Sequence, residues 1–261
     1  MRYQDATDTA LAEMRDRLYE AYASQHAGTG DGEATALVYR RDIRPLLPLP
    51  TAGAVVDIGC GSGTLVRLLQ ADGFDAEGID ISPEQAALAR AAGVARVRQG
   101  DFRTVLAGRP AGYAAITATD LLEHLTKPEV LATFDDASTA LAPGGVFVAR
   151  VPNAVSPLGG HIRNGDFTHL TSFTARSIRQ LAAAAGFAEV VVHSCPPVAH
   201  GLASTARAAV WQAVSACYRI ALAAETGTLR GHVVTQNLTF AARKGRTAAR
   251  YQRGRADRQK E

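Results

Sequence analysis

The stretch that decides the fold is Val55-Val56-Asp57-Ile58-Gly59-Cys60-Gly61-Ser62-Gly63-Thr64. A short run of β-branched residues enters a glycine-rich turn, and an amphipathic apolar run at 65–69 leaves it. This order predicts a strand, a turn and a helix, with glycines where a nucleotide-like ligand must approach the backbone closely. The glycine spacing alone does not say which ligand binds, so the flanking residues must decide.

Outward from this turn, the chain alternates between strand-like and helix-like segments. Strands are predicted at 54–58, 75–80, 94–98, 113–118, 144–151, 187–194 and 233–242. Helices are predicted at 62–72, 83–92, 127–141 and 174–185. Seven strands separated by helical segments predict an α/β fold, in which a mostly parallel sheet has helices on both faces.

The segment before this alternation, residues 1–50, is predicted to form an N-terminal helical cap. Helical spacing links Leu11, Met14, Leu18 and Tyr22. A second helix is predicted over 33–47, and Pro45, Pro48 and Pro50 end it before the first strand. The α/β domain itself is expected to span 51–244.

A helical insertion at 196–230 precedes the last predicted strand. Four of its side chains share one helical face: Trp211, Val214, Tyr218 and Leu222. These residues are expected to pack in the core or in a homodimer contact, with the lining of a substrate pocket as the alternative.

The net charge of +3 is unevenly distributed along the chain. Residues 243–261 carry eight Lys or Arg and two Asp or Glu, a local balance of +6, so the remainder has a balance of −3. A body without a basic surplus argues against a dedicated nucleic-acid binder. The tail 245–261 is expected to be solvated and disordered, with contact to RNA or anionic lipid as the alternative.

The cysteines and apolar segments restrict the setting of the protein. The three cysteines, Cys60, Cys195 and Cys217, have the spacing of neither a disulfide framework nor a zinc site. A reducing, cytoplasmic location is therefore expected, and no metal site is predicted. The first 14 residues contain no long apolar run, and Gln212 and Arg219 interrupt the longest one, so neither a signal peptide nor a membrane span is predicted.

Asp57 lies two residues before the first glycine of the turn. An anion there would repel the pyrophosphate of a dinucleotide, but it suits a ligand that carries an ammonium and a sulfonium group. Thr64 also stands where a dinucleotide fingerprint has its third glycine. These residues favour S-adenosylmethionine over NAD.

Two more carboxylates follow predicted strands. Asp80 ends the second strand, where a carboxylate can accept both hydroxyls of a ribose. Asp101 follows the third strand, where it is expected to accept the exocyclic amine of adenine while Ile81 or Phe102 flanks the ring. Each acid taken singly also fits a helix cap or a turn. Their position at successive strand ends, which converge on one crevice, favours a shared ligand.

In these motifs the chain resembles the class I S-adenosylmethionine-dependent methyltransferases. The matching motifs are Val56-Asp57-Ile58-Gly59-Cys60-Gly61-Ser62-Gly63, Gly78-Ile79-Asp80-Ile81-Ser82 and Gln99-Gly100-Asp101-Phe102, with further matches at 119–125 and 141–145. The resemblance covers roughly 53–195 and implies a Rossmann-like seven-stranded sheet whose last strand is antiparallel. The residues expected to bind the cofactor are Asp57, Gly59, Cys60, Gly61, Gly63, Asp80, Ile81, Asp101, Phe102, Thr119 and Asp120.

The long loop after the fifth predicted strand, residues 152–170, contains the candidates for a general base. His169 is the first candidate, with Asp166 orienting it or acting itself, and His161 is a weaker one. His169 fits equally well a structural residue that ties the loop to the start of the next helix.

Two further segments indicate the kind of acceptor. Parts of 165–187 resemble methyltransferases of polysaccharide, glycolipid and secondary-metabolite pathways. Glu123-His124 resembles a pair that lies beside the cofactor in quinone-biosynthesis O-methyltransferases, and fits equally well a helix-start acid and a packed histidine. The expected acceptor is therefore a small molecule, with a sugar hydroxyl first and the carboxyl group of a small acid or a phenol next.

Other functions are weighed against this one. Residues 120–123 lack the Asn/Asp-Pro-Pro-aromatic motif of enzymes that methylate exocyclic amines of bases, so that reaction is disfavoured. A macromolecular methyltransferase that uses the basic tail to bind RNA or protein is the main alternative. A non-catalytic partner protein is a third class, but the intact carboxylates at 57, 80 and 101 argue against it.

Overall fold

The computed structural model describes residues 14, 18, 32–199, 201–228 and 231–246. Met14 and Leu18 are helical and half-buried, whereas Leu11 and Tyr22 of the same predicted helix lie outside the described residues. Residues 247–261 of the basic tail also lie outside them, so the disorder expected there stays a prediction.

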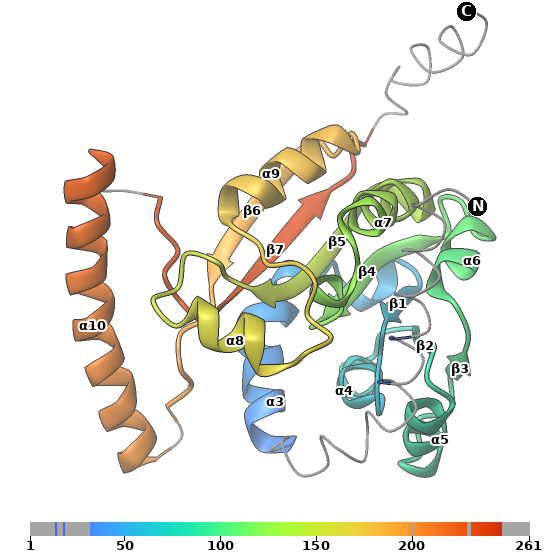
Figure 1. The fold of residues 1–261 in the computed structure, drawn as a ribbon. Helices are drawn as coiled ribbons and strands as arrows, with labels where there is room; N and C mark the ends of the chain where they lie inside the picture. Colours follow the sequence, from blue (N-terminus) through green and yellow to red (C-terminus); the bar gives the residue numbers. More distant parts are fainter. Residues whose placement is uncertain (1–13, 15–17, 19–31, 200, 229–230, 247–261) are drawn as a thin grey trace, which may run out of the picture.

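The described residues contain one sheet of seven strands (Figure 1). The strands are β1 (Val55–Ile58), β2 (Ala76–Asp80), β3 (Val97–Gln99), β4 (Tyr113–Thr119), β5 (Leu141–Pro152), β6 (Glu189–Ser194) and β7 (Asn237–Arg243). Their order is β3-β2-β1-β4-β5-β7-β6, and β7 runs antiparallel to both β5 and β6. The first five strands pair in parallel, so the predicted fold class is confirmed, including the antiparallel last strand.

Helices cover the sheet, and most begin at residues suited to capping. They are α4 (Thr64–Ala71), α5 (Pro83–Ala91), α6 (Phe102–Ala107), α7 (Lys127–Ala140), α8 (Gly159–Gly165), α9 (Ala175–Ala184) and α10 (Leu202–Thr226). Ser82, Thr126 and Thr174 each accept a hydrogen bond from the first turn of the helix that follows. The four helices predicted between strands correspond to α4, α5, α7 and α9, whereas the short α6 and α8 were not predicted.

Two apolar clusters form the core, one on each face of the sheet. Alternate residues of a strand point to opposite faces, so Val55 belongs to one cluster and Val56 to the other. The first cluster packs against α6, α7 and α9 and contains Phe134, whose ring lies 5.4 Å from Phe147 and 5.5 Å from Phe240. The second packs against α4, α5 and the N-terminal segment.

The described part of the N-terminal segment, residues 32–50, contributes side chains to this core. The helix predicted over 33–47 is divided into α3 (Gly32–Val38), a π-helical turn η1 (Tyr39–Ile43) and a 3-10 turn η2 (Arg44–Leu46). Pro45 lies in the first turn of η2, where its missing N–H is tolerated. Tyr39 is 2% exposed and donates a 2.7 Å hydrogen bond to Asp72 at the end of α4, so this segment is fastened to the α/β domain.

The loop after β5 is fastened to the loop after β4. β4 is followed by the 3-10 turn η4 (Leu122–His124), whose Glu123 carbonyl accepts hydrogen bonds from the amides of Leu170 (2.7 Å) and Thr171 (3.0 Å). The Thr171 hydroxyl also donates to the Leu122 carbonyl at 3.0 Å. The two loops that carry the candidate catalytic residues are therefore held together at the carboxyl edge of the sheet.

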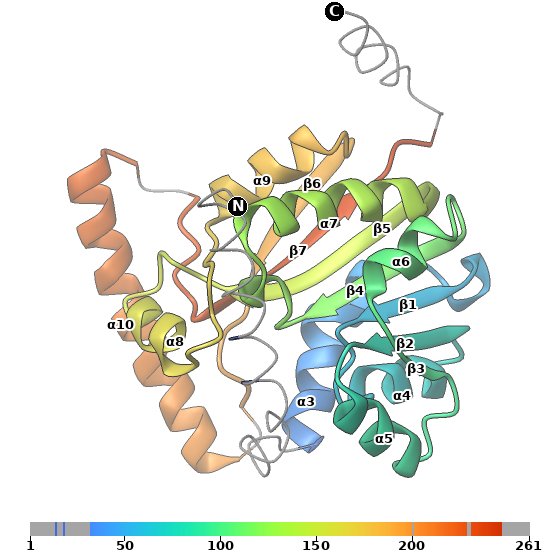
Figure 2. The ribbon, with the colours of Figure 1, turned by 45° about the vertical axis from the view of Figure 1, so that its right-hand side comes forward.

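The insertion forms α10, which lies at the side of the main body in both views (Figures 1 and 2). Trp211, Tyr218 and Leu222 are half-buried and Val214 is 43% exposed, so these side chains do not belong to the domain core. The homodimer contact stays a prediction. Among the helices of the described residues, none is long and apolar enough to cross a membrane.

Candidate functional site

The glycine loop between β1 and α4 requires a left-handed backbone. Gly59, Gly61 and Gly63 have φ angles of 65°, 53° and 76°, which side chains other than glycine rarely adopt. A Cβ at Gly59 would also lie 2.8 Å from the Leu121 side chain. The loop therefore exposes backbone at the end of β1 while it packs tightly against the residues that follow β4.

Asp80 connects this loop to the end of β2. Its Oδ2 accepts a 2.8 Å hydrogen bond from the Gly61 amide, and its Oδ1 accepts one of 2.8 Å from the Ser82 amide. Burial raises the pKa of the Asp80 carboxyl, and the two amide donors oppose this shift. The carboxylate predicted to bind the ribose thus lies beside the glycine loop, already held by two backbone donors.

Asp57 lies beneath the loop and is 1% exposed. Its Oδ1 accepts a 2.7 Å hydrogen bond from the Thr117 hydroxyl of β4, and its buried Oδ2 has no hydrogen-bond partner among the described residues. Burial raises the pKa of Asp57 to about 7, with a smaller contribution from the Asp80 charge. An incompletely satisfied buried carboxyl is the group that a cationic ligand would stabilise in its charged form.

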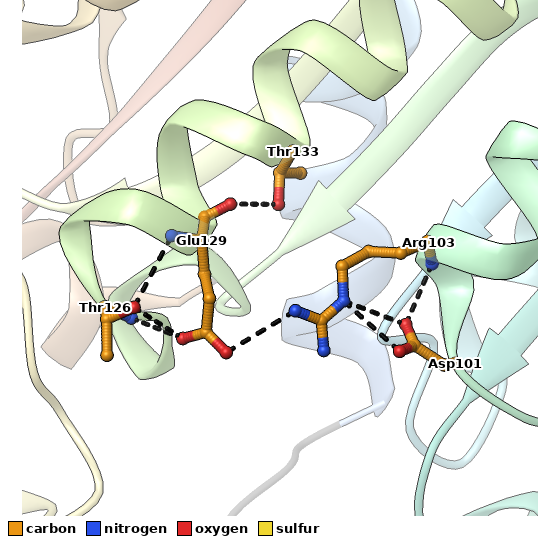
Figure 3. A network of polar contacts seen from close by, with 5 residues as sticks. All are labelled: Asp101, Arg103, Thr126, Glu129 and Thr133. Atoms are coloured by element: carbon orange, nitrogen blue, oxygen red, sulfur yellow. Dashed lines mark hydrogen bonds and ion pairs between the residues drawn. The ribbon is translucent and has the colours of Figure 1, made fainter. Parts of the chain in front are cut away.

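The Asp101 carboxylate forms a hydrogen bond and an ion pair with Arg103 (Figure 3). This carboxylate caps α6 by accepting a 2.9 Å hydrogen bond from the Arg103 amide, and it forms an ion pair with the Arg103 guanidinium at 3.1 Å. Arg103 also reaches Glu129 at 3.5 Å, and Glu129 forms a capping box with Thr126. Asp101 is therefore a helix cap, and its contact with adenine stays a prediction.

The apolar residues predicted around the adenine lie near the strand ends in different environments. Ile81 is 62% exposed directly after β2, and Phe102 is half-buried at the start of α6. Cys60 is 8% exposed and packs beneath the loop, where burial raises the pKa of its thiol. Ile81, after β2, and Phe102, after β3, are therefore both accessible to an adenine ring. Cys60 contributes to the packing beneath the loop.

The ends of β4 and β5 close the other side of the crevice. Asp120 has a left-handed φ of 53° and forms an ion pair with Arg150, whose Nε lies 3.1 Å from its Oδ1. A small cavity of about 70 Å³ is lined by Thr119 and Arg150 and by Tyr39 and Leu65, among others. The N-terminal segment therefore borders the crevice together with the strand ends.

Of the candidate catalytic residues, His169 and Asp166 lie in one cluster with His124, and His161 lies apart from it. The rings of His124 and His169 lie edge to face, with centroids 4.7 Å apart. Thr168 donates to Asp166 at 2.6 Å and lies 2.7 Å from Nδ1 of His124, so Thr168 links Asp166 to His124. The role predicted for Asp166 toward His169 stays a prediction. His161 is exposed on α8 and is not among the residues that form this cluster.

Hydrogen bonding defines the proton positions on the two rings. The Thr168 hydroxyl has one proton, which it gives to Asp166, so Nδ1 of His124 is the donor in its contact with Thr168. Nδ1 of His169 lies 3.0 Å from the Ile162 carbonyl, which only accepts, so it too carries a proton. In the neutral form of each ring the lone pair is then on Nε2.

Burial favours the neutral forms of two groups in this cluster. It lowers the pKa of His124 to about 4, and the neighbouring His169 contributes to the shift. It also raises the pKa of Glu123, which is 1% exposed and whose Oε2 has no hydrogen-bond partner among the described residues.

One ring nitrogen from each histidine and a Glu123 oxygen lie within 4.8 Å of one another, a group able to hold a metal ion. Sequence spacing missed this group because the two histidines are 45 positions apart in the chain.

A protein-family model described as a methyltransferase domain matches residues 32–193 of the chain, more than half of its length. The chain belongs to this methyltransferase family. Membership of this family agrees with the enzyme class predicted from the motifs, a methyltransferase, and with S-adenosylmethionine as the predicted cofactor. The crevice between the glycine loop and the strand ends is thus the candidate site of the methyl donor.

Curated relatives match a part of the chain. A protein named ubiquinone biosynthesis O-methyltransferase from Xylella fastidiosa is 36% identical over 110 residues, which cover 40% of this chain and 44% of the relative. A protein of the same name from Xanthomonas campestris is 32% identical over 104 residues, which cover 38% and 43%. The matched region thus spans less than half of the length of these relatives.

Solved structures share the fold at low sequence identity. A SAM-dependent methyltransferase from Archaeoglobus fulgidus has a TM-score of 0.65 at 18% identity and covers 85% of this chain and 99% of its own. Phosphoethanolamine N-methyltransferase 2 from Haemonchus contortus, solved with S-adenosyl-L-methionine, has a TM-score of 0.55 at 17% identity and covers 88% and 57%. At these identities the likeness establishes the fold alone.

Proposed function

We propose that the protein transfers the methyl group of S-adenosylmethionine to a hydroxyl oxygen of a small molecule, such as a sugar or a phenol. The observation that carries this proposal is the paired His124 and His169 rings beside the cofactor crevice. They come from the loops after β4 and β5, and the names of the curated relatives, which are O-methyltransferases, support the same reaction.

The position of the pair relative to the donor follows from local packing. Leu121, which directly precedes η4, packs so closely on Gly59 that a Cβ there would lie 2.8 Å from it. The η4 turn containing Glu123 and His124 is therefore adjacent to the glycine loop. An acceptor bound between this turn and the loop after β5 would meet the donor at the carboxyl ends of β1 and β4.

The chemistry of the pair favours a hydroxyl acceptor over a carboxylate. A sulfonium is an activated methyl donor, so the protein must align the acceptor and remove its proton. A hydroxyl must lose a proton during transfer, whereas a carboxylate at neutral pH has already lost it. His169 is half-buried and presents the Nε2 lone pair as a base, and the His124 ring and the Ile162 carbonyl position it.

An assay of S-adenosylhomocysteine release tests the function against a panel of sugars, phenols, small carboxylic acids and RNA. The proposal predicts turnover with hydroxylated small molecules and a product heavier by one methylene unit, with the methyl on oxygen. Turnover confined to acids would favour the carboxyl methyltransferase. Turnover confined to RNA or protein would favour the macromolecular alternative.

The base is tested by His169→Ala, with His193→Ala, an exposed histidine of β6, as the matched control. We expect His169→Ala to reduce turnover at least about a hundredfold while S-adenosylmethionine affinity is kept, because general bases contribute on this scale. If His169→Ala lowers turnover by less than about tenfold, His169 is a structural residue and not the base. His193→Ala is expected to behave like the wild type.

A further inference from the structure

α10 carries an apolar face that continues along its whole length. At 100° per residue, twelve side chains occupy an arc of about 160° with no charged or polar member. They are Leu202, Ala203, Ala206, Ala209, Val210, Ala213, Val214, Ala216, Cys217, Ile220, Ala221 and Ala224. All twelve are exposed, and Leu202, Val210 and Ile220 reach 93%, 65% and 67%.

The opposite side of α10 is the one turned toward the body. Ser204 and Ser215 are buried there, and Trp211, Tyr218 and Leu222 are half-buried. The helix thus turns its polar hydroxyls and its large aromatic residues inward and leaves an uninterrupted aliphatic strip outside. A continuous exposed strip of this kind is typical of an interaction surface rather than of a solvated helix face.

We propose that this strip pairs α10 with α10 of a second copy of the chain, in antiparallel orientation, around a two-fold axis at Ala216. The inference goes beyond the methyl-transfer function and does not depend on it. It commits to a self-complementary contact, in which the same ten side chains, those of the strip from Ala206 to Ala224, are used by both copies.

The charges at the border of the strip select this orientation. Arg207 and Glu225 are 18 residues apart, which is five turns, so both lie on the same side of the strip. In an antiparallel pair centred midway between them, at Ala216, each Arg207 faces Glu225 of the other copy. A parallel two-fold pair would instead place the border with Arg207 and Glu225 of one copy on the opposite side of the seam from that of the other copy, so neither charge would have an opposite charge facing it. Charge complementarity therefore favours a second, antiparallel copy as the occupant.

The dimensions of the strip predict a weak dimer. The two helices overlap over residues 206–226, a length of about 30 Å. An apolar strip about 15 Å wide over this length gives roughly 1,000 Å² for both copies, the lower limit for a specific interface. The six alanines of the strip within the overlap allow a short distance between the axes, which improves packing at this size. Dimerisation is thus expected only at high micromolar protein concentrations.

Cys217 provides a direct probe, because it is exposed and lies one residue from the proposed axis. With helix axes about 8 Å apart, the two Cys217 Cα atoms would be about 5 Å from each other, within the range of a disulfide. Cys60 is buried and Cys195 is half-buried, so neither competes for the same contact.

The experiment is mild oxidation of the full chain with copper phenanthroline, followed by non-reducing electrophoresis, with sedimentation over a concentration series in reductant. We expect a disulfide-linked dimer that Cys217→Ser abolishes, and a concentration-dependent dimer in reductant. A monomer at every concentration, with no cross-link, would overturn the proposal. Monomers that bind lipid vesicles through α10 would also overturn it, since the strip would then have another occupant.

Charge reversal tests the orientation. Arg207→Glu should reduce the cross-linked fraction at least about threefold, because two like-charge contacts replace two ion pairs. Arg219→Glu makes the same change on the opposite side of the helix and is expected to have no effect. The double variant Arg207→Glu/Glu225→Arg should restore the wild-type yield. Equal cross-linking in all four proteins would exclude the antiparallel register.

Discussion

At the scale of single residues, burial determines which groups in the crevice are charged. Asp57 is a buried acid with a pKa raised to about 7, and His124 is a buried base with a pKa lowered to about 4. Both shifts favour the neutral form, because desolvation penalises charge. The site without its ligand is therefore less charged than its sequence suggests, and the cationic methyl donor is the natural partner of Asp57.

This argument predicts that S-adenosylmethionine binding depends on pH. The pKa of Asp57 in the folded protein, about 7, lies above its ordinary value of 3.8, so folding favours the protonated carboxyl. Its contribution to stability is complete below the ordinary value and is lost as the pH rises through about 7. The cationic ligand has the opposite preference, because it interacts with the carboxylate.

Binding below this pH should therefore release one proton, and affinity should fall about tenfold per pH unit below the pKa and level off above it. Calorimetry in buffers of different ionisation enthalpy measures the proton release. Asp57→Asn removes the titrating group and should flatten the profile. A wild-type affinity that is constant between pH 5 and pH 8 would contradict the role assigned to Asp57.

At the scale of secondary-structure elements, local sequence signals define most of the fold. Capping residues such as Ser82, Thr126 and Thr174 mark helix starts, and the β-branched run before the glycine loop marks β1. The π-helical turn η1 has no such signal, because it depends on Tyr39 packing into the core and reaching Asp72. The sequence predicts helix there, but packing decides its type.

The capping box of α7 gives a stability prediction. Thr126→Ala removes the hydroxyl that accepts from the Glu129 amide and that also donates to the Glu129 carboxylate at 2.8 Å. The loss should cost about 1 kcal/mol of unfolding free energy and lower the Tm by about 2–4 °C. Thr139→Ala, an exposed threonine of the same helix, is the control. Equal destabilisation by both changes, measured by thermal unfolding, would show that the cap contributes nothing specific.

At the scale of the whole molecule, the order of the strands brings together residues that are distant in sequence. Spacing arguments selected Asp57, Asp80 and Asp101 because each lies at or directly after the end of its own strand. They did not find the grouping of Glu123 and His124 with His169, because it depends on how the loop after β5 folds onto η4. Nor did they indicate that Thr168 connects Asp166 to His124.

The basic tail is expected to be dispensable for methyl transfer to a small molecule. The Gly245 carbonyl accepts a hydrogen bond from the Gly144 amide at 3.3 Å, so a truncation should retain residue 245 and its neighbour. Removal of 247–261 is predicted to leave turnover of a small acceptor within about twofold of the full chain, since solvated termini rarely support a site. Loss of turnover together with loss of salt-sensitive RNA binding would favour the macromolecular alternative.

The central claim is that the crevice formed by the glycine loop and Asp80 holds S-adenosylmethionine. Calorimetric titration with the wild type, with Asp80→Ala and with Asp75→Ala tests it most directly, because Asp75 is an exposed acid directly before the same strand. The account predicts one molecule bound per chain in the wild type and in Asp75→Ala, and no measurable binding in Asp80→Ala. Near-normal affinity in Asp80→Ala would contradict it.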